Sequence, residues 1–288
     1  MWAVARYELT WDLRKKRTYL IVSLFLFAAF VYAYLLPIVA GKSITTGRTE
    51  LGINGVSNLW WVSVVYLVFN TFVSGLFPLL IGGFIAADSL ASEFDKNTIV
   101  PLLSQPVRRV ELYAGKFLEK ILLLLAVSVL FTLLVLAGSE VSVAAQAQLY
   151  MFPLLVFAEF GAFVEFAALA FFFGSFVRSG AMVLGILIAL VFGITGTLLL
   201  LGLQFGLQES MFLVPIANAD FLLQAVPYYV YQPWGVMVIQ GYLMSAPTQP
   251  VVVTVISALE YVLSGLAIIV VSSLAAGYYF FRGAEVKE

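Results

Sequence analysis

The sequence contains no cysteine and no histidine. Without cysteine the chain can form neither a disulfide nor a thiolate metal site, and without histidine it lacks the commonest metal ligand and the commonest general base. Charged residues make up only 11% of the chain, whereas soluble domains carry about a quarter. No nucleophile–base pair or metal motif can be assembled, so an enzyme is the class that the sequence favours least.

Hydrophobic residues, by contrast, make up 62% of the 288 residues. Several apolar runs exceed the ~20 residues that a helix needs to cross a bilayer. None alternates as a lipid-facing strand would, so the sequence predicts an all-α membrane protein with a single membrane domain over residues 1–288. Tilt, kinks at Pro78 and Pro153, or extension beyond the bilayer would accommodate the longer runs. The spans are predicted at residues 18–40, 59–87, 112–137, 150–176, 181–203 and 251–281.

Lysine and arginine are unevenly distributed between the segments that connect these six spans. Thirteen of the 15 lie on one side: before the first span, between the second span and the first turns of the third, between the fourth and fifth spans, and after the sixth. The opposite side of the membrane has only Lys42 and Arg48. Because positive residues favour the cytoplasmic side, both termini are predicted to lie in the cytoplasm.

The N-terminal segment, residues 1–17, places Trp2, Ala5, Leu9 and Leu13 on one helical face, with charged residues over much of the remainder. This pattern predicts an amphipathic helix that lies along the inner membrane surface. The alternative is a frayed basic tail.

A charged connector, residues 88–111, separates the second and third spans. Asn97 can end the preceding helix, Thr98 can cap a short new helix, and Pro106 ends that helix. Three apolar residues of the short helix recur at helical spacing and form a ridge: Ile99, Leu102 and Leu103. This ridge suits docking into a groove on a partner protein, although a surface-lying connector without a partner fits the same pattern.

Three motifs around this connector occur in a fixed order: E-x4-T at Glu93 and Thr98, LLSQPVRR at 102–109, and GK at Gly115 and Lys116. This order resembles the signature of ABC type-2 transporter permeases, the membrane-spanning subunits of ATP-binding cassette exporters. The sequence departs from that family at Asn97, where glycine is usual, and at Arg108, where serine is usual. GSFVRSGAM at 174–182 also resembles the family, as do five N-terminal residues: Arg6, Glu8, Leu9, Leu13 and Arg14.

The resemblance implies that residues 88–111 contact a separate cytoplasmic ATPase subunit and pass its motion to the membrane helices. It implies a second permease subunit, in a homodimer or a heterodimer, a lipid bilayer as surroundings, and the plasma membrane of a prokaryotic cell as location. No nucleic-acid partner is expected. The implied coupling residues are Glu93, Asp95, Lys96, Thr98, Ile99, Leu102, Leu103, Pro106, Arg109 and Lys116.

The sequence has no phosphate-binding loop of the form GxxxxGK[ST]. GKS at 41–43 lacks the upstream glycine and is expected on the outer side. The chain is therefore expected to bind no cofactor, with ATP and Mg²⁺ held by the partner ATPase.

The last outer connector, residues 204–250, is long and unusually apolar. It carries Glu209 and Asp220 but no lysine or arginine, together with eight aromatic residues and five of the ten prolines. Broken helices that re-enter the outer leaflet fit this composition, and the resemblance implies similar helices before the last span. The alternative is simple anchoring at the interface.

Three acids fall inside predicted spans: Glu159, Glu165 and Glu260. They are candidates for a polar translocation path, because a carboxylate in a membrane is costly. Alternatively, each is a protonated acid that hydrogen-bonds a neighbouring carbonyl or hydroxyl and helps the helices to pack. In the predicted fifth span, three glycines are expected to be helix contacts: Gly185, Gly193 and Gly196.

Together these features favour a permease subunit that exports an unidentified substrate with energy from a separate ATPase. One alternative is a stand-alone secondary transporter or channel that uses the intramembrane glutamates. Another is an ABC-type complex that transmits force or signal rather than moving a solute.

Overall fold

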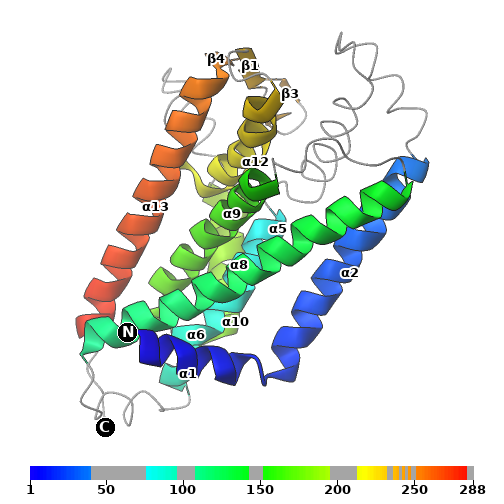
Figure 1. Cartoon of the computed structure of the whole chain (residues 1–288). Coiled ribbons are helices and arrows are strands. Elements are labelled where there is room, and N and C mark those ends of the chain that lie inside the picture. The colour runs from blue at the N-terminus through cyan, green and yellow to red at the C-terminus, as the bar shows by residue number, and fades with distance from the viewer. Residues whose placement is uncertain are drawn as a thin grey trace.

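The computed structural model describes residues 1–39, 76–95, 108–142, 152–194, 213–231, 236–239, 242–243, 246–247 and 251–283. Helices dominate this part of the chain, as the predicted all-α class expects. Long helices run side by side, and the short N-terminal helix α1 (Trp2–Asp12) lies across one end of them (Figure 1).

Helix α9 (Phe152–Gly174) is the centre of the packing. Sixteen of its 23 residues are buried, because it contacts helices on several sides. These neighbours are α6 (Phe84–Asp95), α8 (Arg109–Ser142), α10 (Gly180–Ala189), α12 (Pro215–Tyr231) and α13 (Val255–Gly283). An apolar helix without a polar face is expected in such a position.

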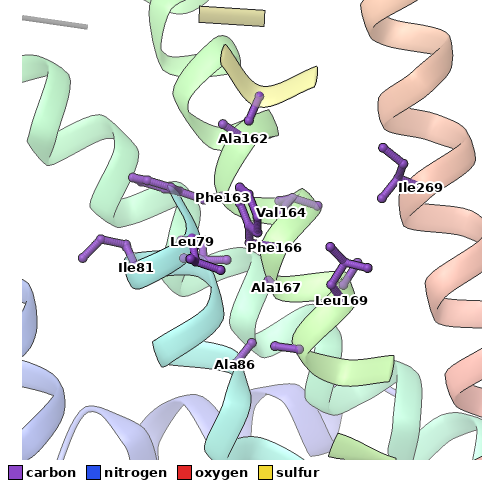
Figure 2. Close-up of a cluster of buried hydrophobic side chains, with 14 of the residues drawn as sticks. Leu79, Ile81, Ala86, Ala162, Phe163, Val164, Phe166, Ala167, Leu169 and Ile269 are labelled. Atoms are coloured by element: carbon purple, nitrogen blue, oxygen red, sulfur yellow. The ribbon is translucent and has the colours of Figure 1, made fainter. Parts of the chain in front are cut away.

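Aromatic and aliphatic side chains fill the space around α9 (Figure 2). The Phe25 ring of α2 (Lys16–Val39) stacks on Phe131 of α8 with ring centroids 5.1 Å apart, and it meets Phe163 of α9 edge-on at 6.0 Å. These contacts tie α2 to two helices that lie far from it in the sequence.

A π-helical turn follows Pro78, where a kink was one of the ways to accommodate a long second span. Pro78 ends α5 (Leu76–Pro78), and the turn η1 (Leu79–Gly83) follows at once before α6 begins. A local widening of this kind is a common cause of a helix bend. Pro153, in contrast, is the second residue of α9, and its missing N–H is tolerated in a first helical turn, so no kink is needed there.

Three of the described helices are long and apolar enough to cross a membrane: Arg109–Ala137, Phe152–Gly174 and Ile256–Gly283. They coincide with the predicted third, fourth and sixth spans. Helix α2 covers the predicted first span. The predicted second and fifth spans lie partly outside the described residues, although α6, α10 and the π-helical turn η3 (Leu190–Ile194) are described there. The count of six spans therefore stays a prediction.

Four short strands are an exception to the all-α prediction. β1 (Val236–Ile239) pairs antiparallel with β4 (Val251–Thr254), and β2 (Tyr242–Leu243) pairs with β3 (Ala246–Pro247) between them. They lie at the opposite end of the bundle from α1 (Figure 1). The valine-rich sequences of β1 and β4 favour strands, so the predicted last span starts too early and α13 begins only at Val255.

Helix α12 covers part of the predicted re-entrant segment, residues 204–250, so a helix was correctly expected there. It is held to α13 by Asn218, whose buried side-chain amide Nδ2 donates a hydrogen bond to the Val262 carbonyl oxygen at 3.0 Å. A buried amide needs such a partner, and this bond fixes where α12 lies along α13.

Candidate functional site

The N-terminal helix carries two acids one turn apart, and α8 carries two lysines with the same spacing. Residues four apart lie on one face of a helix, so Glu8 and Asp12 can meet Lys116 and Lys120 as pairs. Lys116 Nζ donates a hydrogen bond to Glu8 Oε1 at 2.8 Å, and Lys120 Nζ donates to Asp12 Oδ2. Two ion pairs, one turn apart, thus dock α1 on α8.

Lys116 also pairs with Glu93 near the end of α6, so its ammonium group joins three helices. The Lys116 side chain is 1% exposed, while Glu8 and Glu93 are 14% and 15% exposed. Breaking such a buried pair is strongly destabilising, because it leaves an uncompensated charge. The junction of α1, α6 and α8 is therefore held rigidly.

Lys120 is shared in the same way. Besides Asp12 it contacts Glu119 Oε2 at 2.9 Å, and Asp12 in turn accepts a hydrogen bond from Lys15 at 2.5 Å. We refer to the six residues Glu8, Asp12, Glu93, Lys116, Glu119 and Lys120 as the ion-pair junction.

The acids of α1 and α6 respond differently to these surroundings. Burial alone would raise the pKa of Asp12, but the charges and hydrogen bonds of Lys120 and Lys15 outweigh burial and hold that pKa below its usual value. Burial raises the pKa of Glu93, and Lys116 offsets only part of that effect. Asp12 is thus the more firmly ionised of the two.

The close approach of α1 to α8 also depends on Gly115. A Cβ at this position would lie 2.9 Å from the Met1 carbonyl oxygen and 2.9 Å from Val4 Cβ, which is closer than real Cβ atoms come. The two residues of the GK motif thus have separate structural roles: Gly115 leaves room for α1, and Lys116 binds it.

The predicted coupling residues divide into three groups. Glu93 and Lys116 are partners inside the ion-pair junction, and their role in coupling stays a prediction. Asp95 is the last residue of α6, and Arg109 is exposed at the start of α8, where its Nη1 donates a hydrogen bond to the Arg282 carbonyl oxygen at 2.5 Å. The others lie outside the described residues: Lys96, Thr98, Ile99, Leu102, Leu103 and Pro106.

The three acids of the predicted spans are also separated. Glu159 and Glu165 are completely buried in α9, whereas Glu260 is exposed on α13. Neither buried carboxyl group has a hydrogen-bond partner among the described residues. The hydrogen bonds that a packing role for Glu159 and Glu165 would need are therefore not seen among the described residues. A role of the two acids in translocation stays a prediction.

The N-terminal segment forms a helix over Trp2–Asp12 rather than a frayed tail. Trp2 and Leu13 of the predicted apolar face are exposed, whereas Ala5 is completely buried, and the place of α1 at the membrane surface stays a prediction. Sequence reasoning missed Asp12, Glu119 and Lys120 as partners. The signal that could have found two of them is the matched four-residue spacing of acids in α1 and lysines in α8.

Comparison with known proteins bears on the identity of the chain. A family model described as ABC-2 family transporter protein matches residues 2–286, which is nearly the whole sequence. A comparison with curated proteins found no match. The family match agrees with the motif order around the second connector and with three described helices that are apolar and long enough to cross a membrane. The chain therefore belongs to the ABC-2 family of transporter proteins.

Proposed function

We propose that the chain is the permease subunit of an ATP-binding cassette exporter in a plasma membrane. Membership of the ABC-2 family implies association with an ATPase partner. In the proposed assembly two permease subunits pair with each other and with cytoplasmic ATPase subunits, and the ATPase subunits hold ATP and Mg²⁺. The direction of transport and the pairing of permeases follow from the resemblance.

The observation that carries this proposal is the bridge that Lys116 makes between Glu8 and Glu93. Glu93 lies two residues before the end of α6, and Lys116 lies two turns inside α8. The connector between these helices thus leaves and re-enters the membrane domain at one rigid junction. A push on the connector by a partner would move α1, α6 and α8 together.

Orientation can be tested with single cysteines, since the chain has none of its own. We expect a membrane-impermeant maleimide to label Val238→Cys but not Arg108→Cys in sealed cells, because the lysine and arginine distribution places residue 108 inside. Labelling of both variants after permeabilisation is the control. The opposite labelling pattern in sealed cells would overturn the proposed topology.

The apolar ridge of the connector should carry most of the ATPase affinity. Truncating a buried leucine to alanine costs about 2–5 kcal/mol, whereas an exposed ion pair contributes about 0–1 kcal/mol. We therefore expect Leu102→Ala and Leu103→Ala to weaken ATPase co-purification more than Lys96→Ala does. Pro106→Ala should reduce ATP-driven transport more than it reduces binding, because Pro106 fixes where the short helix ends.

The ridge variants need a check that the membrane subunit itself is intact. Gel filtration and thermal unfolding of the purified permease serve that purpose. If both leucine variants fold normally and retain full ATPase binding, the ridge is not the docking surface and residues 88–111 are a connector only.

A second candidate function is a stand-alone secondary transporter that uses Glu159 and Glu165. Their burial in α9 without a described hydrogen-bond partner favours it. Proton or cation flux in liposomes that contain the purified chain and no ATPase would distinguish a secondary transporter from a permease subunit. A permease subunit without its ATPase is expected to show no flux.

A further inference from the structure

The N-terminal helix α1 and the residues after it sort their charges between two faces. Both acids of α1, Glu8 and Asp12, pair with buried lysines of α8. The arginines are turned the other way: Arg6 is exposed on α1, and Arg14 is exposed just beyond its end, as is Lys16 at the start of α2. None of these three cations has an ion-pair partner among the described residues. We refer to Arg6, Arg14 and Lys16 as the cationic face.

Three large aromatic side chains project from the same helix. Trp2, Tyr7 and Trp11 are 63%, 64% and 54% exposed. Exposed rings of this size on one element mark a contact surface, and tryptophan and tyrosine gather at the headgroup level of membranes. Exposed cations and aromatic rings on one helix are typical of helices that lie on a membrane surface.

The start of α2 indicates the depth at which this face would lie. α2 begins at Lys16, and its exposed side becomes apolar one turn later, where Leu20, Leu24 and Phe27 recur at helical spacing. Leu20 is only about 6 Å along the helix axis from Lys16. In a membrane whose hydrocarbon surrounds this apolar side, the cationic face lies at the level of the headgroups.

The packing of α1 indicates which way the cationic face is directed. α1 lies across the long helices (Figure 1), so residues along it share one depth. It contacts the side of α8 rather than its end, because Gly115, Lys116 and Lys120 lie about two to three turns inside that helix. The surface of α1 that is turned away from α8 therefore borders the bundle laterally, where lipid headgroups surround it.

We propose that the cationic face binds anionic phospholipid headgroups, with the three exposed rings of α1 inserted between neighbouring lipids. Guanidinium groups form bidentate hydrogen bonds with phosphate, and each basic residue gains from the negative potential of an anionic surface. A zwitterionic lipid offers a phosphate without net negative charge, so the cationic face selects anionic lipids. On the predicted orientation these lipids belong to the inner leaflet. Binding of this kind requires neither the ATPase nor transport.

The test places one probe in the middle of the cationic face. Thr10 is exposed and lies four residues from both Arg6 and Arg14, and the chain has no cysteine, so Thr10→Cys can carry a single bimane fluorophore. The full chain is reconstituted without ATPase in vesicles that mix phosphatidylcholine with a minority of phosphatidylglycerol. An acyl-chain nitroxide, which quenches bimane on contact, is carried by either lipid in equal amount and in both leaflets. The orientation of the reconstituted chain therefore does not affect the result.

Nitroxide phosphatidylglycerol should quench the probe more strongly than nitroxide phosphatidylcholine, with a relative affinity of about threefold or more. Arg6→Gln combined with Arg14→Gln should bring this ratio close to equality. Arg6→Lys combined with Arg14→Lys keeps both charges and should retain most of the preference. Concentrated salt should lower the ratio in the unsubstituted face, since exposed charges are screened.

Arg178→Gln combined with Arg282→Gln is the matched control, because it removes two exposed arginines on the same predicted side of the membrane but outside α1. Its lipid preference should equal that of the chain with the intact cationic face. Equal quenching by the two lipids, or an equal loss of preference in this control and in the α1 variant, would overturn the proposal. An absence of quenching by either lipid would also overturn it and would indicate that the face is directed to water or to a protein partner. Since no ATPase is present, none of these outcomes affects the test of ATPase association.

Discussion

Lys116→Met is expected to lower the free energy of unfolding by about 3–5 kcal/mol, the usual cost of removing one partner from a buried ion pair. Lys116 is 1% exposed and contacts both Glu8 and Glu93, so the change leaves two carboxyl groups without their shared cation. Methionine is unbranched like lysine, so the loss should come from charge rather than from shape. Thermal unfolding of the purified chain measures it.

The matched control removes the charges of all three residues together. Lys116→Met combined with Glu8→Gln and Glu93→Gln should recover most of the lost stability, because no uncompensated charge remains. Limited proteolysis should also cleave near α1 sooner in the single variant than in the triple variant. A single variant that unfolds at the wild-type temperature would show that the junction contributes nothing to stability.

Gly82→Ala is the second change with a large expected effect. A Cβ at Gly82 would collide with the carbonyl oxygen of Phe163 and lie 3.0 Å from its carbonyl carbon and 3.2 Å from its Cα. These are backbone atoms of α9, which cannot rotate aside as a side chain can. The turn η1 must therefore move away from α9, and we expect a loss of about 1–3 kcal/mol or more, measured by thermal unfolding.

Gly185→Ala is the matched control for this change. Gly185 is also in a helix, but nothing lies within 4 Å of a Cβ built there. Because alanine favours helices over glycine by up to about 1 kcal/mol, this variant should be as stable as the wild type or slightly more stable. Equal melting temperatures for the two variants would contradict the close packing of η1 on α9.

These two glycines also show where the sequence is informative and where it is not. Long apolar runs predict helices reliably, and α8, α9 and α13 lie where the third, fourth and sixth spans were expected. Which side of such a helix contacts other helices is harder to predict when apolar residues lie on all of its sides. Among the described residues, a Cβ at Gly185 or Gly193 would meet nothing within 4 Å, so the predicted helix contacts there are not seen in this part of the chain and stay a prediction. Gly196 lies outside the described residues.

The ion-pair junction illustrates a second limit. Lys116, Glu119 and Lys120 fall at the start of the predicted third span, directly after the charged connector, and only Lys116 was assigned a role there, in coupling to the ATPase. All three are buried, at 4% exposure or less. Their burial depends on α1, whose acids Glu8 and Asp12 lie 108 residues before Lys116 and Lys120. The sequence around the lysines alone does not indicate such a distant partner. The β1–β4 pair was missed for a related reason, because its two strands resemble apolar span residues until their pairing is known.

The separation between α1 and its lysines has a consequence for biosynthesis. Glu8 and Lys116 are 108 residues apart, as are Asp12 and Lys120. At a translation rate of roughly 5–20 residues per second, α1 leaves the ribosome roughly 5–20 s before the residues that neutralise it. During that interval Lys15 is already present to pair with Asp12, whereas the described partner of Glu8 has still to be made. Once α8 exists α1 can dock on it, so α1 reaches its final place only after a helix that is made later.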